Sequence, residues 1–297
     1  MDALGGESVQ ITGSGLKLAG RLFVPAHNRP APALVVGHGA GDSKEPYFEF
    51  CEYLRRNGIA TLALDLAGHG ESEGPRFHVN IRQWVADYRA ALDYLCGRSE
   101  IDAQRLGAFG ISSSGTAVLE AALEEPRLRV LVTSGATVCN SLPFALALII
   151  KTFICLGKIK RAITGTDLRV PLAKLGPPPQ FASDPEVNRR ILSNPKVMES
   201  LMAFPFPGAA EAFFVDTINR VPKITVPTLI LWGAEDKVDP PDTGRKLFEA
   251  LGCKKQFQLI PGSGHAVHLD RSKQKVFELT AEWVSEILGA AARAVAA

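Results

Sequence analysis

The chain has 297 residues, 46% of them hydrophobic, and a formal net charge of +2 at pH 7. A chain of this size can bury a substantial core, either as one elaborated α/β domain or as a core with a cap. The small net charge gives no attraction to nucleic acid, so we expect no nucleic-acid partner.

The cysteines and the first residues bear on the compartment. Five cysteines are scattered without C-x-x-C spacing, at Cys51, Cys96, Cys139, Cys155 and Cys253. Their odd number and their spacing indicate neither a disulfide framework nor a zinc site. Residues 1–7 lack a basic region followed by an apolar core, so we expect no secretory signal there. These features together predict a cytoplasmic protein with reduced thiols.

Strand and helix signals alternate through most of the chain. The start, about 8–24, is expected to form two strands that turn at Gly13 and Gly15. Further strands are expected at 33–37, 59–64, 105–109, 129–134, 227–232 and 256–260, and helices at 46–57, 80–97, 116–125 and 272–289. This alternation predicts a mostly parallel sheet with helices on both faces. The Ala-rich tail, 289–297, is expected to be a fraying helix end.

A loop of small residues follows the strand at 33–37. It reads His38, Gly39, Ala40, Gly41, and its small side chains allow a backbone amide to approach a substrate closely. We expect a structural hydrogen-bonding role for His38, with a catalytic role as the alternative. The glycines match neither a dinucleotide nor a P-loop spacing, so phosphate binding is not indicated.

A second loop, Asp65 to Ser72, follows the strand at 59–64 and reads D-L-A-G-H-G-E-S. Its acidic and histidine side chains allow an alternative interpretation as a metal site formed by Asp65, His69 and His78. The sequence does not favour that interpretation, because no third ligand with fixed spacing is present.

The apolar run that ends near residue 110 has the outline of a nucleophile elbow. A serine at the tip of a strand-to-helix turn has a strained backbone, so the residues two before and two after it must be small. Gly110 and Ser114 flank Ser112 in this way. With Ser113 as nucleophile, Ile111 would occupy the crowded position, and with Ser114 as nucleophile, Thr116 would crowd the other side. We predict Ser112 as the nucleophile, and the alternative is an ordinary Ser/Gly turn.

An acid and a base follow the serine in the order that this architecture uses. The strand at 227–232 leads into Asp236, and carboxylates just past a strand end are typical of functional groups in such sheets. We predict Asp236 as the acid, with Glu235 or Asp239 as alternatives. The strand at 256–260 leads through a glycine-rich loop to His265, the predicted base, whereas His268 is expected to be a surface or helix-start residue.

Between about 137 and 220 the alternation stops, and prolines separate short helical patterns. We interpret 137–220 as a cap inserted between two parts of a core, 1–136 and 221–297. The first part of this segment, Leu142 to Leu156, is strongly apolar and too short to span a bilayer. We expect a cap helix that packs on the core and lines an acyl or aromatic pocket. The alternative is an amphipathic lid helix, 142–161, that places basic residues at lipid headgroups.

Five motifs occur in order along nearly the whole chain: H-G-A-G at 38–41, D-L-A-G-H-G-E-S at 65–72, G-I-S-S-S-G at 110–115, G-A-E-D at 233–236 and G-S-G-H at 262–265. With these motifs the chain resembles the α/β-hydrolase superfamily. Within it, the chain is similar to monoacylglycerol lipases, lysophospholipases and serine aminopeptidases, and also to cinnamoyl and feruloyl esterases. The resemblance implies an α/β-hydrolase fold, a mostly parallel sheet flanked by helices with an inserted helical cap. It implies that Asp65 and His69 are structural, and that Ser114 stands where glycine is usual.

These residues together predict a serine hydrolase that cleaves carboxylic esters with an apolar acyl or aromatic group. Ser112, Asp236 and His265 form the predicted triad, and the amides of Ala40 and Ser113 the predicted oxyanion hole. The same acyl-enzyme would serve a thioesterase or an acyltransferase, and a non-catalytic ligand-binding protein is an alternative of another class. The expected partner is a small-molecule ester or thioester. No cofactor or metal is indicated, and the oligomeric state stays open.

Overall fold

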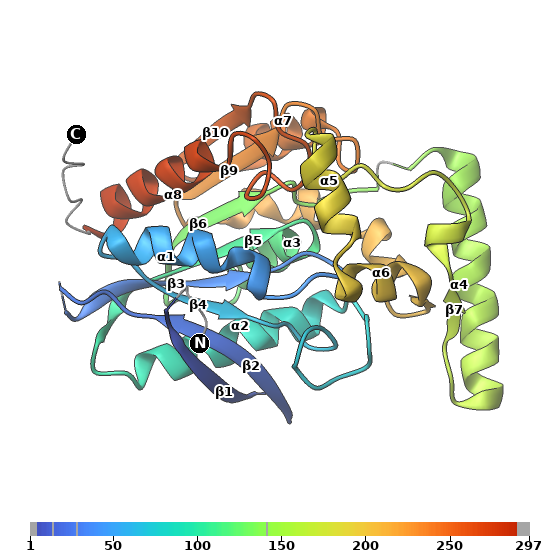
Figure 1. Ribbon diagram of the computed structural model, residues 1–297, viewed down its shortest axis with the longest axis horizontal. Coiled ribbons are helices and arrows are strands. Elements are labelled where there is room, and N and C mark those ends of the chain that lie inside the picture. Colours follow the sequence, from blue (N-terminus) through green and yellow to red (C-terminus); the bar gives the residue numbers. More distant parts are fainter. Residues whose placement is uncertain (1–4, 14, 28, 141, 290–297) are drawn as a thin grey trace.

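An eight-stranded sheet forms the centre of the computed structural model, which describes residues 5–13, 15–27, 29–140 and 142–289 (Figure 1). In spatial order the strands are β1 (Glu7–Gly13), β2 (Leu16–Phe23), β4 (Ala60–Leu64), β3 (Ala31–Gly37), β5 (Ile101–Ile111), β6 (Leu128–Ser134), β9 (Thr228–Gly233) and β10 (Lys255–Ile260). β1 pairs antiparallel with β2, and β2 with β4, while all the other neighbours are parallel. The predicted mostly parallel sheet is confirmed.

The central strands are mainly apolar, as expected where helices cover both faces of a sheet. Every residue of β3 and β4 is buried. One face packs on α1 (Phe48–Arg56) and α8 (Lys273–Leu288), where Phe50 meets Phe277 with ring centroids 5.3 Å apart. The other face packs on α2 (Ile81–Cys96), α3 (Ser113–Ala121) and α7 (Pro241–Ala250).

The direction of the parallel strands decides where functional groups gather. β3, β5, β6, β9 and β10 run in parallel, so their carboxyl ends meet at one edge of the sheet. The candidate residues lie at this edge, in the loop after β3, the turn after β5 and the loops after β9 and β10. Open α/β sheets bind their ligands at this edge.

Two elements differ from their predicted bounds by three or more residues. Helix α3 begins at Ser113 and ends at Ala121, whereas the sequence predicted 116–125. The helix starts directly after Ser112, because the Thr116 amide already donates to the Ser112 carbonyl at 3.1 Å. Strand β5 begins at Ile101, four residues before the predicted start, and the predicted tail helix at 290–297 lies outside the described residues.

The segment 137–220 contributes no strand to the eight-stranded sheet in the described part of the chain. It contains α4 (Phe144–Thr164), α5 (Pro185–Leu192) and α6 (Pro195–Met202). It also contains β7 (Leu168–Val170) and β8 (Phe204–Phe206), which pair with each other in a sheet of their own. Figure 1 shows α4 at the edge of the molecule, away from the eight-stranded sheet.

The prediction that the apolar stretch packs on the core and lines a pocket is wrong. Helix α4 buries only Ala147, Ile154 and Gly157, and Ile154 packs on β7, β8 and the turn Ala210–Phe214. The approach is close at Gly157, where a Cβ would lie 2.0 Å from the Phe206 carbonyl oxygen. The other apolar side chains of α4 stay largely exposed because this contact covers one narrow stripe. Within the described residues, no helix is both long and apolar enough to cross a membrane.

Candidate active site

Ser112 lies at the tip of the turn between β5 and α3 with a backbone that L residues rarely adopt. Its φ is 55° and its ψ is −127°, and among the described non-glycine residues only Phe77 shares a positive φ. Such a conformation costs of order 1–3 kcal/mol and is typical of functional sites. Gly110 makes the turn feasible, because a Cβ there would lie 2.3 Å from the Ser114 carbonyl oxygen. This geometry belongs to Ser112 and to neither of the next two serines.

The Ser114 side chain is buried inside the elbow and has a structural contact. Its hydroxyl accepts a hydrogen bond from the Ile111 amide at 3.0 Å and donates one to the Gly37 carbonyl at 2.9 Å. The hydroxyl of Tyr88 lies nearby and donates to the Phe109 carbonyl at 2.8 Å. Ser114 therefore links the turn after β5 to the end of β3.

His265 and Asp236 are buried and in direct contact. The distance from His265 Nδ1 to Asp236 Oδ2 is 2.8 Å, and the other carboxylate oxygen accepts from the amides of Val238 and Asp239 at 2.8 and 2.9 Å. Burial by itself lowers the pKa of His265, but the charge and hydrogen bond of Asp236, with the charge of Asp239, outweigh it and raise the pKa. Gly135 leaves room for the imidazole, since a Cβ there would lie 3.0 Å from His265 Cε1.

A cavity of about 520 Å³ brings most of the predicted residues together. Ala40, Ser112, Ser113 and His265 line it, while Asp236 lies behind His265. Among the described residues, no hydrogen bond joins the Ser112 hydroxyl to His265. Catalytic hydrogen bonds often tighten only when substrate is bound. None of the α4 residues lines this cavity.

The two alternative acids occupy different positions. Glu235 is exposed, and the cavity wall does not include it. Asp239 is buried on the cavity wall and accepts a hydrogen bond from the Thr137 hydroxyl at 3.0 Å. Burial raises the pKa of Asp239. Asp236 is the carboxylate that contacts His265.

The prediction that His268 lies on the surface is wrong. His268 is 3% exposed, lines the cavity and stacks on Tyr47, with ring centroids 4.2 Å apart. In the described part of the chain neither ring nitrogen has a hydrogen-bond partner. Burial, with the nearby His265, lowers the pKa of His268 to about 3, so the ring is neutral at pH 7.

Sequence reasoning also missed two polar groups beside His268. The Tyr47 hydroxyl donates to Asp42 Oδ2 at 3.3 Å, and both residues line the cavity. Burial raises the pKa of Asp42 to about 7. The position of Asp42 directly after the H-G-A-G loop is the one sequence signal that places it near the site.

The predicted structural role of His38 is confirmed. Its Nδ1 lies 2.7 Å from the Gly39 carbonyl oxygen, and its Nε2 lies 3.0 Å from the Leu66 amide. These contacts require the Nδ1–H tautomer, which donates to Gly39 and accepts from Leu66. Burial lowers the pKa of His38 to about 4, which keeps the ring neutral.

Asp65 holds the loop after β4 in place. Its carboxylate accepts from the Lys44 amide at 2.7 Å, from Lys44 Nζ at 2.6 Å and from the Glu71 amide at 2.9 Å. His69 is buried, and burial lowers its pKa to about 3. His78 instead contacts Asp167, with Nε2 and Oδ2 2.8 Å apart. Asp65 and His78 thus have separate partners, which does not fit a shared metal site.

The family model for serine aminopeptidase, S33 (Hydrolase_4), matches residues 28–272. The chain belongs to this family. The predicted resemblance and the predicted α/β-hydrolase fold are therefore confirmed. The solved structures that are similar to this chain include esterases and a lipase, as the resemblance implied. Membership of this family of hydrolases supports a hydrolase.

Individual relatives of this S33 chain have several activities in their names. It is 37% identical over 125 residues to thiohydrolase aneE of Aspergillus aculeatus, a match that covers 41% of this chain and only 39% of that protein. It is 32% identical to acyltransferase drtE of Aspergillus calidoustus, over 40% of this chain and 38% of that protein. A crystal structure of the Paleococcus ferrophilus monoacylglycerol lipase matches this chain with a TM-score of 0.71 at 22% identity. The match covers 91% of this chain and 98% of the lipase chain. At that identity, the structural likeness shows the fold.

Proposed function

We propose that the protein is a serine hydrolase that cleaves carboxylic esters with an apolar acyl or aromatic group. The observation that carries the proposal is the strained backbone of Ser112, at a cavity whose wall also contains His265 bound to Asp236. A backbone held in this conformation exposes the serine hydroxyl, and a paired histidine is the base that such a hydroxyl needs.

In the proposed reaction Ser112 Oγ attacks the ester carbonyl carbon, and His265 Nε2 takes the hydroxyl proton. Asp236 holds the His265 Nδ1–H and stabilises the imidazolium that forms. The tetrahedral intermediate collapses when His265 gives the proton to the leaving alcohol, which leaves an acyl-enzyme on Ser112. Water then adds to the acyl carbon with His265 as base, and the free acid and the Ser112 hydroxyl are restored.

The oxyanion hole is assigned to the backbone amides of Ala40 and Ser113. Both residues line the cavity with Ser112. Ser113 is the first residue of α3, so its amide is one of the helix N-terminal donors that have no partner within the helix. Gly39 allows the loop to pass close to the nucleophile, since a Cβ there would lie 3.3 Å from Ser112 Cβ. Fixed donors of this kind stabilise charge that develops in the transition state.

The cavity walls support an apolar substrate group. Apolar side chains from the segment 137–220 form much of the lining: Leu172, Phe181, Ile191, Val197, Leu201, Phe204 and Phe213. This contribution also supports the assignment of 137–220 as a cap over a core made of 1–136 and 221–297. Asp42, Tyr47 and His268 add a polar patch to the wall. We infer a substrate whose apolar acyl or aromatic group lies against the cap.

A thioesterase or an acyltransferase is the second candidate, because the same acyl-enzyme serves all three reactions. The names of thiohydrolase aneE and acyltransferase drtE favour it, although the matches cover less than half of each relative. Product analysis separates the candidates: an acyltransferase transfers the acyl group to an added alcohol, amine or thiol, whereas a hydrolase releases the free acid. A non-catalytic ligand-binding protein would bind an apolar ester without turnover.

Hydrolysis of a series of p-nitrophenyl esters by wild type, Ser112→Ala and Ser99→Ala tests the proposal. Ser99 is exposed and lies outside the cavity, so its variant controls for the loss of a serine hydroxyl. We expect Ser112→Ala to lose several orders of magnitude in kcat/KM and Ser99→Ala to keep wild-type values. Wild-type activity in folded Ser112→Ala would exclude the proposed nucleophile.

The compartment is part of the proposal as well. All five cysteines are free thiols, and two of them, Cys96 and Cys155, are exposed. Exposed free thiols persist in a reducing compartment, which supports the predicted cytoplasmic location.

A further inference from the structure

Most of the large apolar side chains of helix α4 are exposed to solvent. Among its side chains, Phe144 is 85% exposed, Leu148 56% and Ile163 79%. At 3.6 residues per turn, one face of the helix, opposite the buried stripe, contains Ala145, Leu148, Ile149, Thr152, Leu156, Ile159 and Ile163. We call these seven residues the outer face. It has no charged residue, and its one polar residue is Thr152, whose hydroxyl donates to the Leu148 carbonyl at 2.9 Å. An exposed, largely apolar face of this kind marks an interaction surface.

The charges on α4 all have one sign. The helix contains Lys151, Lys158, Lys160 and Arg161 and no acidic residue. By helical geometry, Lys151 flanks the outer face on one side and Lys160 on the other, while Lys158 lies next to the buried Ala147. An apolar face between basic flanks is the pattern of a helix that lies in the plane of an anionic membrane surface.

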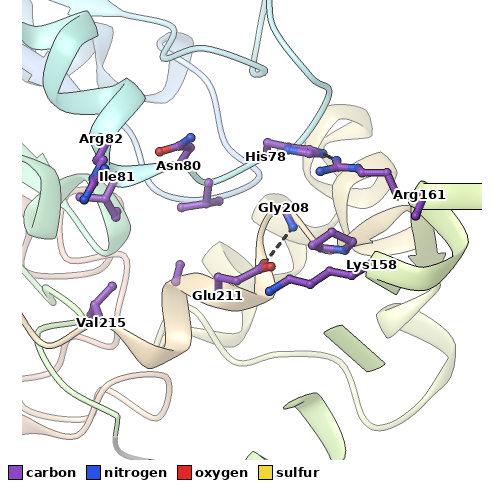
Figure 2. Close-up of a pocket in the computed structure, with 13 residues that line it drawn as sticks. His78, Asn80, Ile81, Arg82, Lys158, Arg161, Gly208, Glu211 and Val215 are labelled. Atoms are coloured by element: carbon purple, nitrogen blue, oxygen red, sulfur yellow. Dashed lines mark hydrogen bonds between the residues drawn. The ribbon is translucent and has the colours of Figure 1, made fainter. Parts of the chain in front are cut away.

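A second cavity, of about 650 Å³, adjoins the C-terminal half of α4 (Figure 2). Figure 2 shows Lys158 and Arg161 on one side of it and Asn80, Ile81 and Arg82 on the other. Its lining also contains Glu211, whose carboxylate accepts from the Gly208 amide at 2.8 Å. This cavity lies outside the candidate active site, because neither Ser112 nor His265 lines it.

Two cations of this second cavity have no partner in the described part of the chain. Arg161 is bound to Asp167, and so is His78. Lys158 and Arg82, in contrast, take part in no hydrogen bond or ion pair among the described residues. Lys158 and Arg82 bring two positive charges to the cavity lining against the one negative charge of Glu211, so the cavity has a net positive charge that suits a phosphate group.

We propose that α4 docks on a membrane surface that contains anionic phospholipids, with its outer face among the acyl chains and a lipid phosphate in the second cavity between Lys158 and Arg82. The charge pattern favours this occupant over a second copy of the chain. A second copy would bring another α4, whose charged residues are also all basic, against this one, and like charges repel. An anionic surface compensates the same charges.

Aromatic side chains connect the docking helix to the candidate active site. Phe153 of α4 lies 5.9 Å from Phe206, ring centroid to ring centroid, and Phe206 lies 5.4 Å from Phe204. Phe204 lines the cavity that contains Ser112. An apolar substrate that leaves the bilayer at α4 would thus meet an apolar wall leading towards the serine. This route rests on the proposed function, whereas the docking itself does not.

Co-sedimentation with vesicles tests the docking. The wild type is mixed with vesicles of phosphatidylcholine alone or of phosphatidylcholine with phosphatidylglycerol, and the bound fraction is measured. We expect at least tenfold stronger binding to the anionic vesicles, weakened by salt. Equal binding to both vesicle types, or binding to neither, would overturn the proposal.

Two test variants, each with a matched control variant, locate the contact. Leu148→Ser with Ile159→Ser removes apolar side chains of the outer face and should abolish binding, while Leu175→Ser, at an exposed leucine outside α4, should not. Arg82→Ala with Lys158→Ala should remove most of the preference for anionic vesicles. Lys246→Ala with Lys275→Ala removes the same charge from α7 and α8 and should keep the preference. If both double charge variants lose the preference for anionic vesicles to the same extent, a lipid headgroup site at the second cavity would be excluded.

Two controls separate the docking from its alternatives. Ser112→Ala should bind vesicles like the wild type, so failure of the proposed hydrolase function leaves the docking result unaffected. Sedimentation velocity of the wild type and the outer-face variant, without vesicles, reports the oligomeric state. The proposal would be wrong if the wild type is a dimer that binds no vesicles and the outer-face variant is a monomer. That result would show that a second copy of the chain covers α4.

Discussion

The Ser114 hydroxyl donates a hydrogen bond to the Gly37 carbonyl at 2.9 Å and thereby joins the end of β3 to the turn that contains Ser112. The same hydroxyl accepts from the Ile111 amide, so it satisfies two buried backbone groups. A glycine at this position would provide neither contact. The serine in this chain is therefore a structural part of its elbow.

Loss of this hydroxyl should destabilise the protein. In Ser114→Ala the Gly37 carbonyl and the Ile111 amide lose a buried partner, so we expect the free energy of unfolding to fall by about 1–3 kcal/mol. Urea denaturation of wild type and variant measures the difference. Ser99→Ala, at an exposed site, should change the free energy by less than about 0.5 kcal/mol. Equal stability of Ser114→Ala and wild type would contradict the structural role.

Asp236→Asn should lower both the activity and the pKa of His265. Asp236 raises that pKa above the ordinary value of 6.5, so in the wild type kcat/KM falls when the pH drops through a value above 6.5 and His265 gains a proton. Without the carboxylate the acid limb should move to lower pH, and kcat should fall by roughly 10⁴-fold. A pH profile of kcat/KM provides the measurement. An acid limb that does not move would exclude the assigned partner.

Asp239→Asn is the matched comparison for that experiment. Asp239 raises the pKa of His265 through its charge but forms no hydrogen bond with it among the described residues. We expect a smaller downward shift of the acid limb and a kcat that stays within about tenfold of wild type. If Asp239→Asn loses as much activity as Asp236→Asn, the roles of the two carboxylates would have to be exchanged.

His268 should make the folded protein sensitive to acid. Burial lowers its pKa to about 3, so an unfolded chain with an ordinary pKa of 6.5 binds a proton that the folded chain does not, and stability falls as the pH drops below 6.5. Between pH 7 and pH 5 this effect amounts to about 2 kcal/mol.

His268→Phe keeps a ring stacked on Tyr47 and removes the titrating group. Unfolding by urea at pH 7 and at pH 5 measures its effect. The loss of stability between these two pH values should be about 2 kcal/mol smaller in the variant. An identical loss in both proteins would show that His268 does not titrate as its burial implies.

The fold could be predicted from the sequence because its signals are local. The wholly buried strands read as apolar runs, for example Ala31–Gly37, and each functional loop follows such a run directly. The positions of Ser112, Asp236 and His265 relative to strand ends could also be predicted, because parallel strands end at one edge of the sheet. Their contact distances depend on the loops and required the structure.

What the sequence did not indicate depends on contacts between distant segments. His268 is buried because Tyr47, more than two hundred residues earlier, stacks on it, and no local pattern contains that contact. The apolar stretch of α4 suggested a packed helix, but its stripe of contact with β7 and β8 covers only Ala147, Ile154 and Gly157. An apolar sequence shows what a helix can bury and does not show whether a partner is present.

A fluorophosphonate probe reports whether Ser112 is an activated nucleophile, on which the proposed hydrolase activity depends. Wild type and Ser112→Ala are treated with the probe, and the intact mass and the labelled peptide are determined by mass spectrometry. We expect one adduct per wild-type chain, located on Ser112, and none on the variant. Labelling at a different residue, or an unlabelled wild type that is folded and accessible to the probe, would contradict this expectation.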